Sequence, residues 1–335
     1  MAFYDTLKLE KGMYGTPGKS FTQILEQMDP SENYCGTNLE GLDAYQRQLK
    51  RFDIKVGGPC SDTVEKFFQT TDSTALFPEY VARAVRQGME QANALPAIVA
   101  TVTNIASMDY RTLACDTMTA GLTGTAEGVA LPETKIMNKS SLVSLKKRGR
   151  VLASSYEALR LHPLDLFTVM LRQIGAYIAR MQLGDALDVL LKDDEGEALA
   201  ADVTTTGATP VYGELLELWS KVAPYELNTM LASTATMKDL MAIQELQDAT
   251  AGLNFQGTGK MITPLGANLV HTPSLKDKTI IGLDKNCTLE MVQAGGIVLD
   301  YDRLIDRQME RAAISTITGF AKIFDGAARI LAYKA

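Results

Sequence analysis

The chain has 335 residues and a mass of 36.4 kDa, enough to bury one large core or two to three small ones. Hydrophobic residues make up 46% and charged residues 22%, which are the proportions of a folded globular protein and argue against wholesale disorder. The net charge of -7 and the pI near 5.1 argue against a dedicated nucleic-acid binder, which is normally basic.

The sequence indicates neither a targeting signal nor a disulfide scaffold. No apolar run approaches the roughly 18 residues of a membrane span, and the chain does not begin with the basic-then-apolar pattern of a signal peptide. We therefore expect a protein that is made and kept in the cytoplasm and has no membrane partner. Four scattered cysteines are too few for a disulfide scaffold, so we expect them to be reduced and structural.

The first 75 residues or so are polar and rich in turn-forming pairs such as Pro17-Gly18 and Asp29-Pro30. Short helices are predicted at Phe21–Gln27 and Leu42–Phe52, but neither has enough apolar surface to be stable alone. This segment is interpreted as an arm that lies on another surface, for which neighbouring chains are the expected source. We expect it to keep its initiator methionine, with no propeptide removed.

After the arm the pattern becomes regular. Pro78 suits a first helical position and apolar residues follow at helical spacing, which predicts a helix over about 79 to 93. The stretch Ala97–Ile105 is rich in Val, Ile and Thr and is typical of a strand. The next segment, Asp109–Gly149, has several glycines near its middle and no helical periodicity, so it is interpreted as an extended excursion from the body.

A basic strand is predicted to end this excursion. Two apolar patches in Leu142–Ala153 flank a basic tetrad formed by Lys146, Lys147, Arg148 and Arg150. The tetrad is compatible with a nucleic-acid contact, but on a projecting strand a solvated or subunit-pairing surface is favoured.

The strongest periodic signal runs from Pro163 to Leu191, where apolar residues repeat at three and four positions. A helix of this length would measure about 45 Å. It is far longer than an average helix and requires a sheet or a long groove to lie along.

The rest of the chain alternates between helices and strands. Helices are predicted at Val211–Val222 and Met237–Leu246. Strands are predicted around Asn268–His271, Thr279–Leu283, Thr288–Gln293, Ile297–Asp300 and Ala312–Ile317. The class predicted by this order is mixed α+β, without internal repeats.

No constellation for catalysis or metal binding is found. The two histidines, His162 and His271, are far apart and lack a neighbouring Cys or carboxylate cluster. The tetrapeptide Gly257–Lys260 resembles a phosphate loop, but Asn254 and Met261 occupy the positions where that loop needs glycine and a hydroxyl residue. We predict no catalytic, cofactor-binding or metal-binding residues.

Acidic clusters at Asp193–Glu195 and at Asp300 with Asp302 lack the spacing of a calcium loop, so solvated charge is the favoured interpretation.

Several segments resemble the capsid proteins of tailed bacteriophages, which have the HK97-like fold. Ala75–Gly88 (ALFPEYVARAVRQG) resembles the segment that leads from the arm into the body, and Val151–Leu159 (VLASSYEAL) resembles the foot of the protruding loop. Ile178–Leu191 is similar to the end of the long spine helix, although Lys192-Asp193-Asp194 stands where relatives have glycines. Met261–Leu299 resembles the later part of the axial domain. The resemblance covers about residues 75 to 335.

The resemblance implies an α+β, HK97-like subunit with named parts. These would be an N-terminal arm (1–75), the start of the P-domain (76–108), an E-loop hairpin (109–150), the P-domain with its spine helix (151–204), an A-domain (205–300), and a P-domain return with C-terminal closure (301–335).

The function implied is that of a major capsid protein, not an enzyme, that self-assembles through hexamers and pentamers into an icosahedral shell. Its other partners would be a portal protein and scaffolding or decoration proteins, with packaged double-stranded DNA nearby but not bound by sequence. The shell would be the virion capsid, assembled in the cytoplasm of the host bacterium without a cofactor. Expected contacts between subunits are Lys135, Lys139, Lys146, Lys147, Arg148 and Arg150 on the E-loop, and Tyr45, Arg47 and Phe52 on the arm.

Some members of this fold join subunits by an isopeptide bond between an E-loop lysine and a P-domain asparagine. This chain has Lys135 and Lys139 on the loop, but no asparagine follows Asn286. We therefore predict that a denaturing gel of mature particles shows a single monomer band. A ladder of covalent oligomers would contradict this prediction.

Two alternatives remain from the sequence. An encapsulin-like compartment shell that encloses cargo enzymes would share the fold, but the long arm favours the phage capsid. An α+β hydrolase or transferase would need a convergent nucleophile, base or phosphate cradle, which the sequence does not show.

Overall fold

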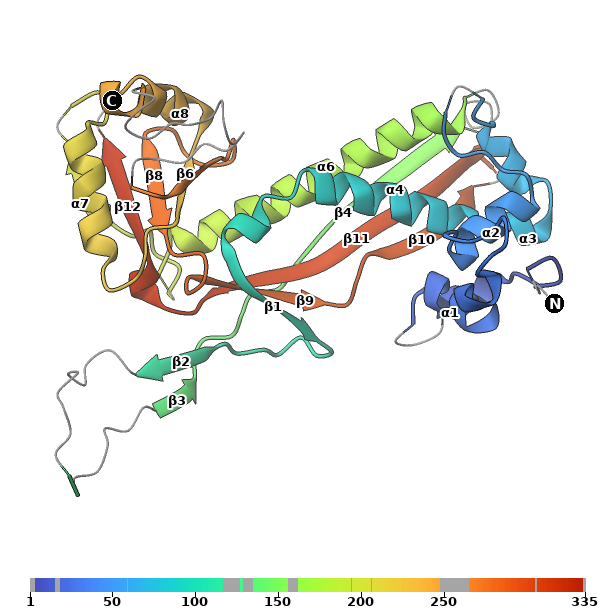
Figure 1. Cartoon of the computed structure of the whole chain (residues 1–335), viewed down its shortest axis with the longest axis horizontal. Coiled ribbons are helices and arrows are strands. Elements are labelled where there is room, and N and C mark those ends of the chain that lie inside the picture. Colours follow the sequence, from blue (N-terminus) through green and yellow to red (C-terminus); the bar gives the residue numbers. More distant parts are fainter. Residues whose placement is uncertain are drawn as a thin grey trace. The chain divides into compact units, whose positions relative to one another are not determined.

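The computed structural model shows a mixed α+β chain (Figure 1). It describes all residues except 1–3, 16–18, 59, 117–126, 129–134, 156–161, 194, 206, 248–264, 305 and 334–335. The α-helices are α1 (Phe21–Met28), α2 (Ala44–Arg51), α3 (Thr71–Thr74), α4 (Phe77–Gln91), α6 (Leu164–Leu190), α7 (Tyr212–Val222), α8 (Thr234–Met241) and α9 (Gln244–Gln247). The strands are β1 (Val99–Ile105), β2 (Leu113–Asp116), β3 (Lys135–Asn138), β4 (Lys146–Ser155), β5 (Val203–Thr205), β6 (Thr229–Ala232), β7 (Asn268–His271), β8 (Thr279–Leu283), β9 (Leu289–Ala294), β10 (Val298–Leu304), β11 (Met309–Lys322) and β12 (Ala328–Tyr333).

These elements form two compact units, each assembled from separate stretches of the sequence. Unit 1 contains Met1–Ala92, Gly149–Ile178 and Ile297–Ser315. Unit 2 contains Asn93–Arg148, Ala179–Gly296 and Thr316–Ala335. The unit boundaries fall within β4, α6 and β11, so each of these elements contributes residues to both units.

The N-terminal segment of unit 1 packs onto α4 of its own chain. Capping boxes at Ser20 and Asp43 begin α1 and α2, which satisfies backbone N–H groups at both helix starts. The buried side chains of Leu25 and Phe67 join the hydrophobic core that includes α4. The segment was expected to lie on neighbouring chains, and the structure differs because its apolar residues reach a core within the chain.

In unit 1, α4 and α6 approach each other closely at two glycines. A Cβ atom on Gly88 would lie 2.1 Å from the carbonyl oxygen of Arg172, and one on Gly175 would lie 2.0 Å from the carbonyl oxygen of Val85. Since carbon and oxygen atoms cannot approach this closely, the helix crossing requires glycine at both positions.

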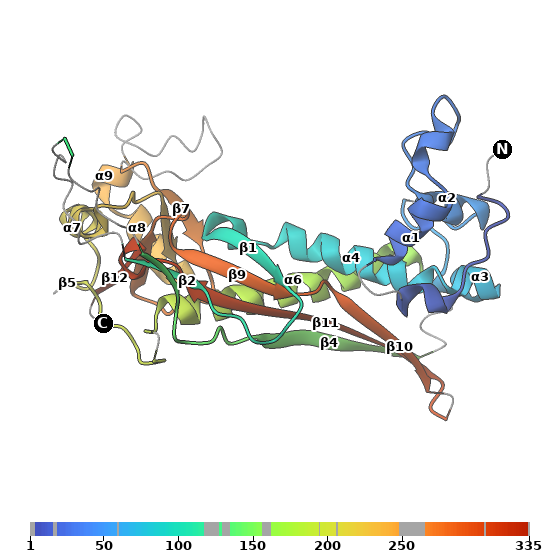
Figure 2. The same ribbon diagram turned by 90° about the horizontal axis from the view of Figure 1, so that it is seen from below.

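Unit 1 also contains a small antiparallel sheet. β10 pairs with the first half of β11, from Val298 opposite Ser315 to Leu304 opposite Met309, and β4 pairs with β11 as well. Figure 2 shows β4 and β11 side by side. Leu152, Leu299 and Ile314 contribute to the hydrophobic core, and the side chain of Ile314 is fully buried there.

Unit 2 is built around a five-stranded sheet in the order β5-β12-β8-β6-β7. Helices α7 and α8 bury Leu215, Leu218 and Met237 in its core. β1 pairs in parallel with β9, and β9 pairs antiparallel with Thr318–Lys322 of β11.

Most elements predicted from the sequence are confirmed. The helices at 21–27, 42–52, 79–93, 163–191 and 211–222 and the strands at 97–105, 268–271, 279–283 and 288–293 are all present, with ends shifted by a few residues at most. The helix predicted over Met237–Leu246 is wrong in part, because α8 begins earlier, at Thr234 after the Ser233 cap, and ends at Met241 before α9 begins. β10 and β11 are longer than predicted.

Candidate functional site

The excursion from unit 2 carries a two-stranded hairpin. β2 and β3 pair antiparallel, with Leu113 opposite Asn138 and Cys115 opposite Ile136. Because side chains alternate between the two faces of a strand, Leu113, Cys115 and Ile136 share one face. Leu113 is 55% exposed and Ile136 is 66% exposed, so this face presents apolar side chains to solvent.

The outgoing side of the hairpin is anchored by a buried carboxylate. Glu290 on β9 accepts hydrogen bonds from the hydroxyl groups of Thr103 (2.5 Å), Tyr110 (2.7 Å) and Thr112 (2.5 Å). Burial and the hydrogen bond to Glu290 raise the pKa of Tyr110 above its ordinary value, so its hydroxyl stays a donor. These three bonds fix the residues on either side of Asp109 to the sheet of unit 2.

The returning side of the hairpin is anchored by a second buried carboxylate. Asp185 on α6 is 6% exposed and accepts two hydrogen bonds from Arg148, at 2.6 and 2.8 Å, and one from Lys146 at 2.9 Å. The bidentate geometry with arginine is the strongest form of such a pair. Burial acts to raise the pKa of Asp185, but the hydrogen bonds from Arg148 and Lys146 outweigh it and lower the pKa below its ordinary value of 3.8.

This lowered pKa predicts an acid-sensitive anchor. A carboxyl group whose pKa is depressed by folding stabilises the fold above its ordinary pKa of 3.8, and that contribution is lost as pH falls through the lower folded-state value. We expect Asp185→Asn to cost about 1 to 3 kcal/mol at pH 7. Because the contribution is lost in acid, the two proteins should approach each other in urea melts as the pH falls from 3.8 through the lower folded-state pKa. A difference between them that is the same at pH 7 and in acid would contradict this prediction.

The six basic residues predicted as contacts have different environments. Lys135 on β3 and Lys147 on β4 are exposed. Lys139 is mostly covered, with its ammonium group 3.5 Å from a carboxylate oxygen of Asp325. Lys146 and Arg148 bind Asp185, as described above. Arg150 belongs to unit 1, where its guanidinium group lies 3.8 Å from the ring centroid of Tyr177.

The arm residues predicted as contacts lie mainly inside their own chain. Arg47 is fully buried and binds the carboxylate of Asp29 at 2.8 Å, and Tyr45 is 2% exposed. Phe52 is partly buried and packs against the core of unit 1. Since Arg47 and Tyr45 have almost no exposed surface, their contacts are within the subunit, which differs from the contact with a neighbour that the sequence suggested.

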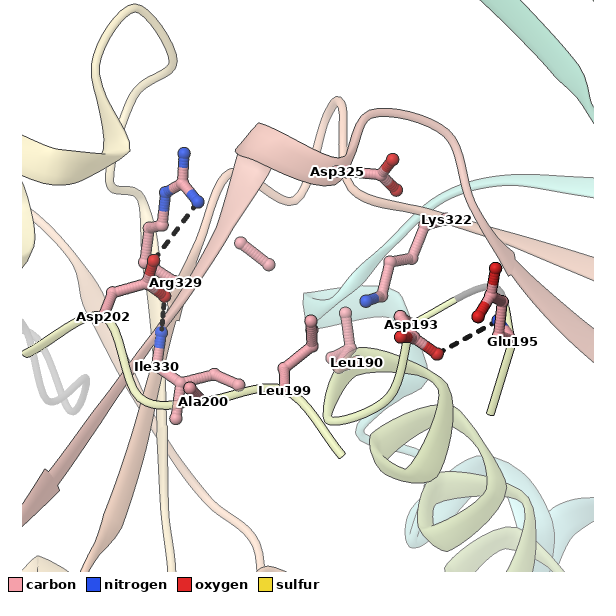
Figure 3. Close-up of a pocket in the computed structure, with 11 residues that line it drawn as sticks. Leu190, Asp193, Glu195, Leu199, Ala200, Asp202, Lys322, Asp325, Arg329 and Ile330 are labelled. Atoms are coloured by element: carbon pink, nitrogen blue, oxygen red, sulfur yellow. Dashed lines mark hydrogen bonds and ion pairs between the residues drawn. The ribbon is translucent and has the colours of Figure 1, made fainter. Parts of the chain in front are cut away.

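A cavity of about 410 Å³ lies in unit 2 beside the end of α6 (Figure 3). Two of its carboxylates accept hydrogen bonds from the protein itself. Asp202 accepts hydrogen bonds from Arg329 (3.2 Å) and from the Ile330 N–H (2.9 Å), and Asp193 accepts the N–H of Glu195 at 3.0 Å. Among the described residues that line the cavity, no nucleophile lies beside a base.

No group of three metal-ligating side chains occurs among the described residues. His162 is exposed, and His271 contacts the Thr234 hydroxyl at 2.8 Å. The tetrapeptide Gly257–Lys260 lies outside the described residues. In the part of the chain that the structure describes, no helix is long and apolar enough to cross a membrane.

Asp185 and Glu290 were missed by sequence reasoning. Asp185 follows Ile178 by seven residues, which places it on the buried side of the helix, and a carboxylate there was a signal that it has a cationic partner. Glu290 is buried between apolar neighbours in a strand. Its hydroxyl partners lie about 180 positions earlier in the sequence, so no local pattern identifies them.

Comparisons with known proteins point to one family. A family model described as phage capsid protein matches residues 138–323, which is more than half of the chain. No curated protein matches the sequence.

Solved structures similar to the chain include two capsids and a virus-like particle. The mature capsid of bacteriophage PhiM1 has a TM-score of 0.51 and 10% identity, covering 72% of this chain and 87% of that one. The capsid of a native GTA particle has a TM-score of 0.53 and 14% identity, covering 72% and 91%. A virus-like particle from Pyrococcus furiosus has a TM-score of 0.50 and 11% identity, covering 76% and 98%. At these identities the similarity concerns the fold.

Proposed function

The chain belongs to the phage capsid protein family, and from this premise we propose that it is the major capsid protein of a tailed phage. In this proposal, copies of the chain assemble through hexamers and pentamers into an icosahedral shell around a double-stranded DNA genome. The protein acts through its surfaces and has no catalytic role.

The exposed apolar face of the β2–β3 hairpin is the observation that carries this proposal. An isolated two-stranded hairpin is marginally stable in water and needs a further surface to cover its apolar face. Leu113 and Ile136 are more than half exposed within one chain. A second copy of the chain would cover them, and exposed apolar patches of this kind mark interaction sites.

The two anchors support this role because they hold the hairpin at both ends. Glu290 fixes the outgoing side and Asp185 fixes the returning side, so the hairpin is presented from a rigid base. Because the hairpin is already held in place, it loses less conformational entropy when it binds a neighbouring subunit. Many such contacts around a shell add up to a stable particle.

We assign the parts of the chain as the family resemblance implies. The arm is 1–75, the E-loop is 109–150 and carries the hairpin, the P-domain contains α6, and the A-domain is 205–300. Further partners would be a portal protein and scaffolding or decoration proteins. The net charge of -7 supports a shell that encloses DNA without binding it tightly.

An encapsulin-like compartment shell is the alternative function with the same fold. The family match favours the phage capsid. Particles from a phage-producing culture should contain nuclease-protected DNA, whereas an encapsulin-like shell would contain cargo enzymes.

Electron microscopy of the protein expressed alone tests the proposal. We expect closed shells of uniform diameter from the parent chain. Ile136→Asp should place a charge in the covered face and prevent shells while leaving the circular dichroism spectrum unchanged, because Ile136 contacts little of its own chain. Met137→Asp on the opposite face of the hairpin is the matched control and should still form shells. Monomers from the parent chain, or normal shells from Ile136→Asp, would contradict the proposal.

A further inference from the structure

The sheet of unit 1 has two edges without a partner strand in the described part of the chain. Met309–Ser315 of β11 pair with β10 on one edge. Gly149 of β4 lies against Ile314 and Ser315 of the same stretch, and β4 also pairs with β11. Because a strand has two edges, β4 and β10 occupy opposite sides of β11. Their outer edges are open to pairing with another chain.

The β4 side presents a positive charge among apolar side chains. The guanidinium carbon of Arg150 lies 3.8 Å from the ring centroid of Tyr177, and a guanidinium stacked on a ring keeps its N–H donors available for hydrogen bonds. Large apolar side chains on the same stripe of α6 as Tyr177 are at least 39% exposed, namely Leu166, Val169, Met170 and Tyr177 itself. We call these residues with Arg150 the Arg150 face.

The β10 side presents the complementary chemistry. Val298 is 48% exposed, and Asp300 and Asp302 follow it at alternate positions with exposed side chains. The three therefore share one face of the strand. Asp302 also lies 3.5 Å from Arg311, a pair exposed enough to be weak. We call Val298, Asp300 and Asp302 the β10 face.

We propose that the Arg150 face of one copy binds the β10 face of the next copy. Each face combines apolar surface with charge, and the charges have opposite signs. A bidentate contact from the guanidinium of Arg150 to Asp300 or Asp302 would set the register. The Arg150 face lies at the β4 edge of the sheet and the β10 face at the β10 edge, so the contact joins two different surfaces. It is therefore heterologous and repeats from copy to copy until a ring closes.

This inference rests on the proposed function, because it assumes that copies assemble. It goes beyond the hairpin contact, because it joins two surfaces of unit 1 that include no residue of the β2–β3 hairpin.

A charge-swap experiment tests it. We expect Arg150→Glu to lower the yield of shells about tenfold or more, since a weak repulsion is repeated at every contact. Adding Asp300→Arg or Asp302→Arg to Arg150→Glu should restore shells in one of the two combinations. Asp306→Arg, in the exposed turn after β10, is the matched control and should assemble normally. Normal assembly of Arg150→Glu, or no rescue by either aspartate variant, would overturn the inference.

A measurement on the unaltered protein covers the case in which a variant does not fold. Hydrogen–deuterium exchange, resolved by peptide mass spectrometry, would be compared between assembled shells and dissociated subunits. We expect the backbone amides of 149–155 and of 298–304 to exchange more slowly in shells, because the contact covers both segments. If shells form but the exchange of both segments is unchanged, the inference fails while the proposed function stands. If the parent chain forms no shells, the proposed function itself fails.

Discussion

Gly175→Ala is expected to destabilise the subunit by about 2 to 3 kcal/mol or more, because added volume at a close-packed crossing forces backbone shifts. A methyl group at this position would meet the carbonyl oxygen of Val85 at 2.0 Å. That oxygen belongs to the α4 backbone and cannot rotate away, so α4 and α6 must separate. The loss should appear as a lower urea midpoint in purified protein.

Gly184→Ala in the same helix is the matched control. Nothing lies within 4 Å of a Cβ atom at Gly184, so this change should be neutral or stabilise the helix by up to about 1 kcal/mol. Equal midpoints for the two variants would show that the helix crossing is not as close as the structure places it.

Arg47→Met is expected to cost about 3 to 5 kcal/mol, which is the usual cost of leaving a buried charge without its partner. Arg47 is fully buried, and Asp29, whose carboxylate it binds at 2.8 Å, is 1% exposed. The guanidinium also lies 4.3 Å from the ring centroid of Tyr34. We expect the N-terminal segment to lose its structure, with faster proteolysis before residue 75 and a lower urea midpoint.

The matched control is Lys50→Met, one turn along α2. Lys50 is exposed, so its replacement should change the free energy of unfolding by less than about 0.5 kcal/mol. If Arg47→Met were as stable as the control, the N-terminal segment would be an independent arm, as the sequence first suggested. The experiment thus separates an arm held by neighbours from one built into the subunit.

The long helix was predicted well because its apolar pattern lies within one continuous stretch of sequence. The apolar rhythm from Pro163 to Leu191 predicted α6 to within one residue at each end. Three short strands, β5, β6 and β12, were not predicted. Thr229–Ala232 of β6 is buried at every position, so it shows no alternation that separates a strand from a helix turn.

The candidate contact residues were predicted less well than the fold. The sequence pattern identified the basic tetrad as one group, but its members make different contacts. Lys146 and Arg148 anchor the hairpin through Asp185, whereas Arg150 stacks on Tyr177 in the other unit. The partners of these side chains, Asp185 and Tyr177, lie 27 to 39 positions further along the sequence. No local pattern therefore shows which basic residue is paired within the chain.

Residue patterns along the chain were enough to identify its class, a mixed α+β protein with a long helix, an extended excursion and segments that resemble tailed-phage capsid proteins. These features follow from local periodicity and from short motifs. The surfaces that are available for assembly could be identified only after the chain had folded. Tyr45 and Arg47 are buried within their own chain and so are not available as contacts, whereas Leu113 and Ile136 remain exposed. The reason is physical, because exposure depends on which distant segments cover a side chain, and that is fixed only when the chain has folded.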